Sequence, residues 1–445
     1  MRIGYCSPFN PMRSGISDFS EELVVELKKH MEVVIISPVE PSNTIIREQF
    51  EWHYITDLDD ISFRNSLDMV VYHMGNNERF HGKIAEAVQK YPGIVELHEI
   101  GLHHLAAEMF WVKKGPEAYK DIAEYCHGAR GKKIAAAFLD GRAGAPWEEH
   151  ALDMTMNRYI LENAIGVIVH SEAVKQMVLG EKEDVPIANI LLHDSDVNCK
   201  VPDRKICRKK IGIPEDSCTF GAFGFATRAK RIIPELDALK RLQETTNREY
   251  RFLIVGQPQE ELHLEEEIAQ RGLRDQVIVT GFTSLEDFKT YMGACDFCLN
   301  LRYPTQGESS ASLHRMLGMG KPAIVTDVGT FSDYPDDVVI KVRCDAHEID
   351  DIYAAIRLLS DNQKELVRRS EAAVRFAKEN CDIRKNAQRY AAFFEQVSTN
   401  TWQPDYEDVM IGRLCDLGLT GNSYLKHIWD SLQTIVERSI KEGNI

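Results

Sequence analysis

Apolar runs of strand length alternate with helical stretches from one end of the chain to the other. In the first half these runs are Arg2–Cys6, Val33–Ile36, Met69–Tyr72, Ile94–Leu97, Gly166–Val169 and Ile190–Leu192. In the second half they are Phe220–Phe223, Phe252–Val255, Val277–Val279, Phe297–Leu301, Ala323–Val325 and Val338–Ile340. Strands that alternate with helices form parallel sheets covered by helices on both faces. Two such series predict an α/β fold with two doubly wound domains.

The stretch His193–Ile211 separates the two series, because it is polar, contains a proline and lacks apolar periodicity. We therefore expect an N-terminal domain over residues 1–200 and a C-terminal domain over residues 207–384. Residues 102–161 carry helical segments with no strand between them, which predicts an insertion over one end of the first sheet. Residues 385–445 are mostly helical, and we expect them to pack partly back on the N-terminal domain.

Charge and cysteine usage narrow the class of protein. The formal charge of −16 argues against general nucleic-acid binding, which needs Lys and Arg to neutralise phosphates. No apolar run approaches the ~20 residues that span a bilayer, and the N-terminus lacks the layout of a signal peptide. The ten cysteines are scattered, as is typical of reduced thiols. We therefore expect a cytoplasmic protein without a nucleic-acid partner.

A glycine-bearing loop leads into a helix within Asn300–Asp333. The loop ends at Gly307–Glu308, and Ser309 and Ser310 open the helix. The first N–H groups of a helix lack internal partners, and the helix dipole favours negative charge there. The segment therefore predicts a phosphate site. The alternative is that the serines only cap the helix.

Basic side chains gather after the first strand of the second domain. Gly224 ends that strand, and Arg228, Lys230 and Arg231 follow within seven positions. Basic residues at the start of a helix oppose its dipole. The cluster therefore indicates an external anion such as a diphosphate, for which Lys and Arg are the expected partners. The alternative is a solvated basic helix start.

Polar residues also follow strands of the first domain. After the first strand, Gly15 allows a close backbone approach, the N–H groups of Ile16 and Ser17 can face a ligand, and Ser17 or Asp18 can cap the next helix. The absence of G-x-G-x-x-G argues against a nicotinamide dehydrogenase. His98 follows another strand, at the edge where ligands bind.

The role of His98 stays open between an active-site residue, a structural residue and a metal ligand. His98 and His103 are five positions apart, whereas the zinc-protease motif needs histidines four apart on one helix face.

The order and spacing of these segments resemble retaining glycosyltransferases of family four, which have the GT-B fold. The resemblance runs through SPFNPMRSGIS, YHMGNN, LHEIGLHHL, GVIVHSEAV, the Gly224 to Lys230 segment, VIVTGF and PTQGESSASLHRMLGMGKPAIVTDVG. It implies two Rossmann-like domains that face a cleft, with a C-terminal helix crossing back. The C-terminal domain would hold a nucleotide-sugar and the N-terminal domain would receive the acceptor. A hexose-type sugar would then move to a hydroxyl group with retention.

The resemblance also assigns roles to single residues. Gly15 and the backbone N–H groups of Ile16 and Ser17 would touch the donor diphosphate. The side chains of Arg228 and Lys230, which follow Gly224, would bind the same diphosphate. His98 would face the transferring sugar and Glu308 would contact its hydroxyls. The N–H groups of Ser309 and Ser310 would meet the phosphate. Phe282 and Thr283 would lie beside the base, although Phe282 could equally pack in the core.

Two positions depart from that family's pattern. Its two glutamates, eight positions apart, fall on Gly307 and Arg315 here, so Glu308 is displaced by one position. Arg315 cannot accept hydrogen bonds from ribose. It can instead donate to ribose, pair with Glu308 or face elsewhere. The usual arginine after the strand glycine is replaced by Phe225, and Arg228 can substitute for it.

We expect transfer without a metal or cofactor. The Asp-x-Asp candidate after a strand-like run, Asp194-Ser195-Asp196, falls at the domain boundary and is interpreted as a solvated linker. Two alternatives on the same fold are a sugar-nucleotide epimerase and a non-catalytic nucleotide-sugar-binding protein. The sequence does not fix the base, the sugar, the oligomeric state or the acceptor, for which a glycan or a lipid-linked molecule is expected. Trp111, Lys113 and Lys114 leave peripheral membrane contact open against an ordinary half-buried helix.

Overall fold

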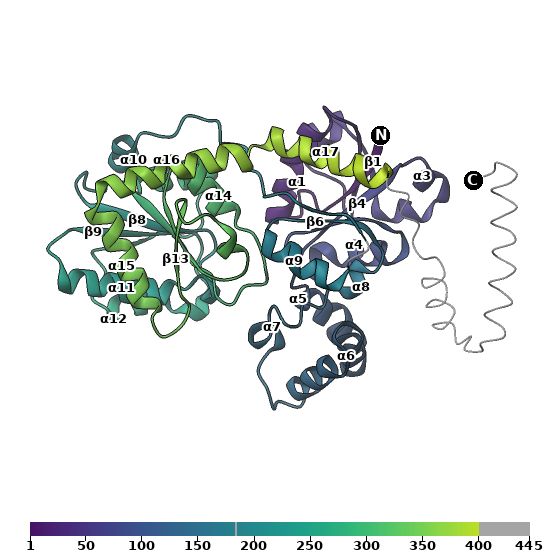
Figure 1. Ribbon diagram of the computed structural model, residues 1–445, viewed down its shortest axis with the longest axis horizontal. Helices are drawn as coiled ribbons and strands as arrows, with labels where there is room; N and C mark the ends of the chain where they lie inside the picture. The colour runs from purple at the N-terminus through teal and green to yellow at the C-terminus, as the bar shows by residue number, and fades with distance from the viewer. Residues whose placement is uncertain (183–184, 400–445) are drawn as a thin grey trace, which may run out of the picture. The chain divides into compact units, whose positions relative to one another are not determined.

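The computed structural model describes residues 1–182 and 185–399. Its N-terminal domain is built on a parallel sheet of seven strands in the order β3-β2-β1-β4-β5-β6-β7 (Figure 1). The strands are β1 (Arg2–Cys6), β2 (Glu32–Ser37), β3 (Glu51–Tyr54), β4 (Met69–Met74), β5 (Gly93–Leu97), β6 (Ala164–Val169) and β7 (Ile187–Asn189). The sequence did not reveal β3, because EWHY has no apolar run. The expected strand Ile190–Leu192 is wrong, since β7 ends just before it.

Helices cover the sheet between its strands. They are α1 (Gly15–Leu27), α2 (Thr44–Gln49), α3 (Ile61–Asn65), α4 (Glu78–Lys90) and α9 (Glu172–Glu181), with a 3-10 turn η1 (Ile55–Asp59). The cap of α1 is Ser14, whose hydroxyl accepts the Ser17 N–H at 3.0 Å. This corrects the expectation that Ser17 or Asp18 caps the helix. Leu23, Val24 and Leu27 of α1 are buried in the core, as expected for an amphipathic helix.

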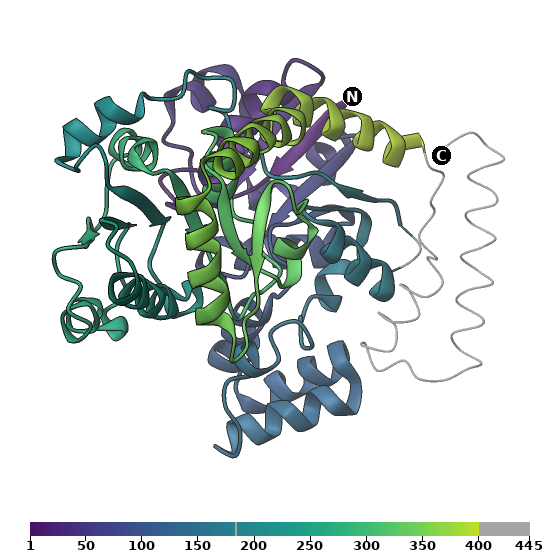
Figure 2. The ribbon, with the colours of Figure 1, turned by 60° about the vertical axis from the view of Figure 1, so that its left-hand side comes forward.

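A run of helices lies between β5 and β6. These are α5 (His103–Ala106), the π-helical η2 (Ala107–Val112), α6 (Pro116–Leu139), α7 (Pro146–Glu149) and α8 (Arg158–Leu161). Figure 2 shows the helices around α6 projecting from the lower side of the domain. Phe138 joins them, because its ring meets Trp111 and Trp147 edge-on, each at 5.2 Å between ring centroids.

The C-terminal domain has a six-stranded parallel sheet in the order β10-β9-β8-β11-β12-β13. Its strands are β8 (Cys218–Phe223), β9 (Tyr250–Val255), β10 (Val277–Val279), β11 (Phe297–Asn300), β12 (Ala323–Thr326) and β13 (Val339–Val342). Its helices are α10 (Arg204–Ile211), α11 (Ile232–Thr245), α12 (Leu264–Gln270), α13 (Leu285–Ala294), α14 (Ala311–Gly318), α15 (Glu348–Asp361) and α16 (Gln363–Asn380), with the 3-10 turns η3 (Arg228–Lys230), η4 (Glu260–Leu262) and η5 (Gly329–Asp333).

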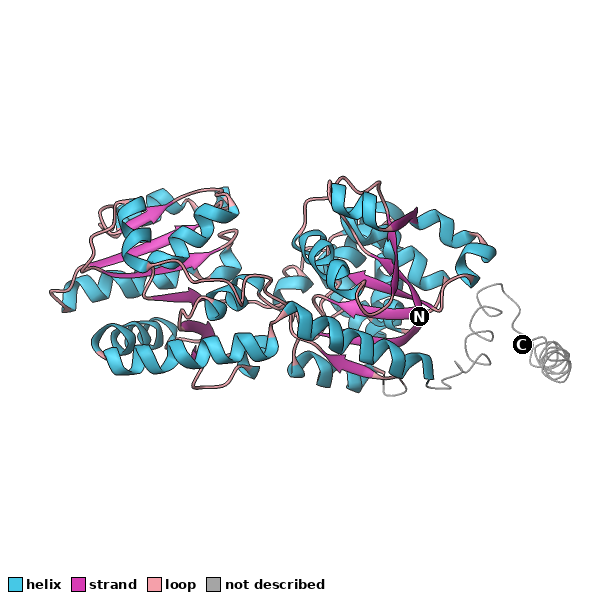
Figure 3. Cartoon of the chain, turned by 90° about the horizontal axis from the view of Figure 1, so that it is seen from above, coloured by secondary structure: helices cyan, strands magenta, loops and turns pink. Residues whose placement is uncertain are grey.

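Each sheet has helices on both faces, as Figure 3 shows from above. In the C-terminal domain one core lies between the sheet and the buried residues of α11, α12 and α15, and stacked Phe220, Phe252 and Phe297 form its centre. A second core on the other face includes buried residues of α14 and α16. The predicted fold class, with two doubly wound domains, is confirmed.

The last described helix, α17 (Ile383–Thr399), follows α16 and returns to the first domain. Asn386 donates to the Leu191 carbonyl at 2.7 Å, and the Tyr390 hydroxyl donates to Glu96 at 2.8 Å. These bonds tie the helix to the first sheet. The remainder of the expected helical tail, residues 400–445, lies outside the described residues. Within the described ranges no helix combines the length and the apolar character needed to cross a bilayer.

Candidate active site

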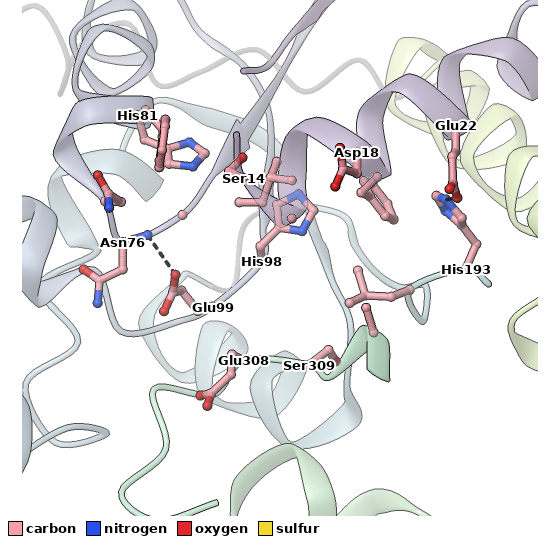
Figure 4. A pocket seen from close by; sticks show the side chains of 18 of the residues that line it. Ser14, Asp18, Glu22, Asn76, His81, His98, Glu99, His193, Glu308 and Ser309 are labelled. Carbon is pink, nitrogen blue, oxygen red and sulfur yellow. Dashed lines mark hydrogen bonds and ion pairs between the residues drawn. The ribbon is translucent and has the colours of Figure 1, made fainter. Parts of the chain in front are cut away.

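Two adjoining cavities lie at the carboxyl ends of the strands of both sheets. The smaller, of about 460 Å³, is lined by Gly15, Ile16, His98 and Glu99 of the first domain and by Glu308, Ser309, Ala311 and Arg315 of the second (Figure 4). The larger, of about 820 Å³, shares Asn76, Asn77, Glu99 and Glu308, and adds Arg228, Gln259, Arg302 and Trp147. Ligands bind at this edge of open parallel sheets. The structure therefore brings most of the expected site residues together from both domains.

The start of α1 forms one wall of the smaller cavity. Gly15 and Ile16 line it, and a Cβ added at Gly15 would meet no atom within 4 Å. Ser17 does not fit its expected role, because its side chain is buried and its N–H already donates to Ser14. The backbone of Gly15 and Ile16 is therefore the part of this loop that faces the cavity.

His98 lies in the wall opposite Glu308, directly after β5 (Figure 4). Its N–H donates to the Met74 carbonyl at 3.0 Å, and the ring of Phe19 meets its imidazole edge-on at 5.1 Å. Burial, followed by the neighbouring histidines, lowers the pKa of His98 well below its ordinary value, so the ring is neutral near pH 7. His103 does not join it, because that ring is buried between Met154 and Tyr119.

Glu99 is a site residue that sequence reasoning did not select. It lines both cavities, and its carboxylate accepts the Asn76 N–H at 2.9 Å. Burial raises the pKa of Glu99 to about 7, and the nearby Glu308 adds to that effect. Its place directly after His98 at a strand end was the available signal.

Lys230 lies against the end of β8. Its ammonium donates to the Phe223 carbonyl, and a Cβ added at Gly224 would come within 2.8 Å of its Nζ. Glycine at 224, which has φ of 92°, therefore leaves the space that the ammonium occupies. Burial lowers the pKa of Lys230 to about 7, and Arg302 lowers it further while Glu235 and Glu308 oppose the effect.

The neighbouring arginines have different partners. Arg228 is exposed and lines the larger cavity, where its N–H approaches Gln259 at 3.4 Å. Arg231, which the sequence grouped with it, instead forms a two-point ion pair with Glu348, including an Nε to Oε1 contact of 2.8 Å. Arg228 and Arg231 both line the larger cavity, although the charge of Arg231 is already paired with Glu348, whereas Lys230 is not among the residues that line either cavity.

The start of α14 forms the facing wall. The Ser310 hydroxyl accepts the Leu313 N–H at 3.2 Å and donates to Asn300 at 3.0 Å, so Ser310 is the cap of the helix. The Ser309 hydroxyl donates to the His170 carbonyl at 3.2 Å. Both hydroxyls are therefore engaged within the protein, and what the helix start offers a ligand is its backbone N–H groups and its dipole.

Glu308 is held within its own loop. One carboxylate oxygen lies 3.0 Å from Arg302 Nε, and the other accepts from the Thr305 hydroxyl at 2.9 Å and the Gln306 N–H at 2.7 Å. Glu308 nevertheless contributes to the lining of both cavities. Arg302, which follows β11, is a partner that the sequence did not suggest.

Arg315 faces away from Glu308, toward the segment that joins the domains. Its Nε lies 3.7 Å from Asp194 and 3.9 Å from Asp196. Pairing with Glu308 is therefore not found, whereas Arg315 still lines the smaller cavity, so donation to a ribose stays a prediction. The same contacts correct the interpretation of Asp194 as part of a solvated linker, since Asp194 is buried and its N–H donates to the Cys381 carbonyl at 2.8 Å. Because this segment is polar, its sequence could not show that Asp194 is buried where α14 and α17 pack.

Phe282 and Thr283 are not among the residues that line the two cavities. They follow β10, and the Phe282 ring is 86% exposed, which excludes the core-packing alternative. Phe225, at the end of β8, is also exposed, at 54%. Two exposed aromatic side chains therefore lie at the carboxyl edge of the second sheet, on either side of β9.

Comparison with known proteins supports a glycosyltransferase architecture. Residues 203–376 match the family described as glycosyl transferases group 1. No curated protein sequence matches the chain. Among solved structures, HepE from Anabaena in complex with UDP is similar with a TM-score of 0.62 and 14% identity, over 89% of this chain and 100% of that chain.

Two further solved structures share the fold of this chain. Sucrose-phosphate synthase from Thermosynechococcus elongatus has a TM-score of 0.61 and 13% identity, over 89% of this chain and 99% of that chain. WaaG, a glycosyltransferase involved in lipopolysaccharide biosynthesis, has a TM-score of 0.58 and 15% identity, over 88% and 99%. At such low identity these likenesses show the fold. Residues 203–376 are thus similar to glycosyl transferases group 1, and the chain has the two-domain GT-B fold of these structures.

Proposed function

We propose that the protein is a retaining glycosyltransferase, which moves a hexose-type sugar from a nucleotide-sugar to a hydroxyl acceptor. The observation that carries the proposal is the convergence of the α1 start, Arg228 and the α14 start on adjoining cavities at the edges of two parallel sheets, with Lys230 against the end of the strand β8. The group 1 match over residues 203–376 supports it. So does the fold that the chain shares with HepE, whose solved structures contain UDP, UDP with glucose, and UDP-glucose.

The donor diphosphate would bind between the domains. Arg228 would supply positive charge from the wall of the larger cavity, and Lys230 would supply it from the end of β8, near Arg302 and Glu308. The N–H groups at the starts of α1 and α14 would supply oriented dipoles from the other sides. Such preorganised groups stabilise charge that develops on the leaving diphosphate. No metal on the diphosphate is required by this arrangement.

Transfer would proceed on one face of the sugar. The bond between the anomeric carbon and the diphosphate oxygen breaks, and the acceptor oxygen bonds to the same carbon. The acceptor proton passes to the departing diphosphate oxygen, so no protein nucleophile is needed. His98 and Glu99 would hold the sugar from the first domain, and Glu308 from the second.

For the acceptor, the proposal gives only a chemical class and a place of entry. We propose that a glycan or lipid-linked acceptor enters beside the helices between β5 and β6, and that the protein works in the cytoplasm. Trp111 packs on Phe138, Lys113 pairs with Glu78, and Lys114 lies over the Phe110 ring at 4.7 Å. Exposed Val112 lies between them. A peripheral membrane contact by this segment remains a proposal for the liposome test below.

A donor screen followed by a turnover assay tests the function. The nucleotide-sugar that raises Tm most is chosen, because a ligand that binds only the folded state stabilises it. Release of nucleoside diphosphate is then measured with an acceptor panel, and NMR of the product gives the anomeric configuration. We expect Lys230→Ala to lower kcat by about 10²–10³-fold, and Lys240→Ala, an exposed lysine of α11, to leave it unchanged.

The alternatives have distinct outcomes in the same assay. A new sugar nucleotide that forms without any acceptor would identify an epimerase. Tight binding without turnover of any donor would identify a binding protein. Unchanged turnover in Lys230→Ala would contradict the assignment of the diphosphate site.

A further inference from the structure

Four polar side chains converge behind the cavity, at the carboxyl ends of three adjacent strands. His73 in β4 and Glu96 in β5 are register partners. Alternation along a strand places His98 on the same face as Glu96, two residues on. His170 follows β6 in the same way, two residues after Ile168, which is the register partner of Glu96. Register alone therefore gathers three imidazoles around one carboxylate.

The nitrogen and oxygen atoms of this cluster are spaced like the ligands of one metal ion. His73 Nδ1 lies 3.2 Å from His98 Nε2 and 3.4 Å from Glu96 Oε2. Glu96 Oε1 lies 3.4 Å from His170 Nε2 and 3.7 Å from His98 Nε2. A tetrahedral ion with bonds of about 2.0–2.1 Å has ligands about 3.3–3.4 Å apart. The measured distances lie close to that value, although they use both oxygens of Glu96. His73, Glu96 and His98 each offer one atom within 4.8 Å of the other two, so these three residues form the set and His170 borders it through Glu96.

The hydrogen bonds around the cluster leave lone pairs directed into it. His170 Nδ1 donates to the Ile190 carbonyl at 2.6 Å, so its Nε2 carries no proton in the neutral ring. That bare nitrogen faces the Glu96 carboxylate. Within the described residues, neither His170 Nε2 nor Glu96 Oε2 has a hydrogen-bond partner. The carboxylate oxygen nearest to that nitrogen is Oε1, at 3.4 Å, and the unpartnered Oε2 lies 3.4 Å from His73 Nδ1. A proton or a metal ion would satisfy these atoms, and the spacing of the group fits the ion.

The carboxylate also lacks a counter-charge. The Glu96 side chain is fully buried, and among the described residues its ionic neighbours are histidines alone, His73, His98 and His170. A buried carboxylate normally pairs with a cation or coordinates a metal. Three neutral imidazoles do not provide that charge.

We propose that His73, Glu96 and His98 bind one divalent transition-metal ion of the zinc class, and that the neighbouring His170 turns in as the fourth ligand when the ion binds. Imidazole and carboxylate ligands suit zinc. The surroundings fit, since ligating histidines usually donate their other N–H to a carbonyl and ligating carboxylates are themselves hydrogen-bonded. His170 donates to Ile190, and Tyr390 donates to Glu96. The proposal departs from the expectation of a chain that binds no metal.

The ion would be structural and would act through His98. It would lie behind the cavity wall, separate from the diphosphate, and would fix the imidazole of His98 in one orientation toward the donor. The ring of Phe19 covers the cluster from the cavity side, with centroid distances of 5.1 Å to His98 and 6.1 Å to His170. Because Tyr390 belongs to α17, the ion would also tie the returning helix to the first sheet.

Metal content tests the proposal without any substrate, so its failure leaves the transferase proposal standing. The full chain is purified without a histidine tag, and its metals are measured by inductively coupled plasma mass spectrometry. We expect about one ion per chain, chiefly zinc. Replacement by Co²⁺ should give the strong visible absorption of a tetrahedral site. Removal by a chelator should lower Tm, and added Zn²⁺ should restore it.

Variants locate the ion. Glu96→Gln and His170→Asn should each lose the bound metal, and circular dichroism should show that they fold. His103→Gln is the matched control, because His103 is a buried histidine of the same domain whose nitrogens contact Met154 and Tyr119. It should lower Tm yet keep one ion per chain. If Glu96→Gln fails to fold, the metal content and the Co²⁺ spectrum of the natural protein decide whether the site binds an ion.

Two results would overturn the proposal. One is a natural protein that neither retains nor takes up an ion after incubation with Zn²⁺ or Co²⁺. The other is a folded Glu96→Gln variant with undiminished metal content.

Discussion

From the lowered pKa of Lys230 we predict that the affinity for the donor depends on pH. Burial lowers the pKa of Lys230 from 10.5 to about 7 in the free protein, so the side chain loses its charge as the pH rises through 7. A diphosphate favours the charged form and raises that pKa in the complex. If the pKa returns to 10.5, the charged form gains about 5 kcal/mol, which sets the upper limit of the coupling. Above pH 7 donor binding must therefore take up a proton.

Titration calorimetry in two buffers of different ionisation enthalpy measures that proton directly. A nucleotide-sugar is the proper ligand, because its diphosphate lacks the terminal phosphate proton that titrates near pH 6. At pH 8 a group with a pKa of about 7 is about nine-tenths deprotonated, so we expect nearly one proton taken up per donor bound. Near pH 6 the uptake should vanish, and Kd should rise up to tenfold per pH unit above 7.

Lys230→Met is the control for this experiment, because it keeps the length of the side chain and removes the ammonium. It should bind the donor more weakly at pH 6.5 and show neither proton uptake nor the rise in Kd. Binding by the natural protein at pH 8 without proton uptake would refute the reasoning, since Lys230 would then be charged already or would not meet the anion.

Three further changes have defined outcomes. Gly224→Ala places a Cβ within 2.8 Å of Lys230 Nζ at a position with positive φ. It should lower the free energy of unfolding by about 1–2 kcal/mol and weaken donor binding about tenfold. A donor affinity equal to that of the natural protein would contradict this expectation. Ser14→Ala removes the cap of α1 and should lower the free energy of unfolding by about 1 kcal/mol in urea, whereas Ser14→Asp should retain it. Simultaneous alanine replacement of Trp111, Lys113 and Lys114 should reduce sedimentation with anionic liposomes, and absence of binding by the natural protein would end that proposal.

The fold was largely predictable because apolar runs report buried parallel strands. β1 and β10 begin and end where the sequence placed them, since continuous hydrophobic runs are bounded by polar residues. β3 was missed because an edge strand with the sequence EWHY buries little. α1 was expected to begin later, and Ser14 rather than Ser17 caps it, because several serines in one loop offer competing caps.

The details of the site were less predictable because they depend on contacts between distant segments. The direction of Arg315 is set by Asp194, which is buried only once α14 and α17 have packed. The pairing of Arg231 with Glu348 removes one cation from a cluster that looks uniform in the sequence. The cluster around Glu96 draws on β4, β5 and β6, so no local motif could reveal it.

The central claim is that a nucleotide-sugar diphosphate binds between the two domains, beside Lys230 and the starts of α1 and α14. A crystal structure of the complex with the donor that raises Tm most would test it directly. We predict diphosphate oxygens within hydrogen-bond distance of Lys230 Nζ and of the N–H groups of Gly15 or Ile16, with the sugar against His98. A donor bound elsewhere, with that space left to solvent, would contradict the account.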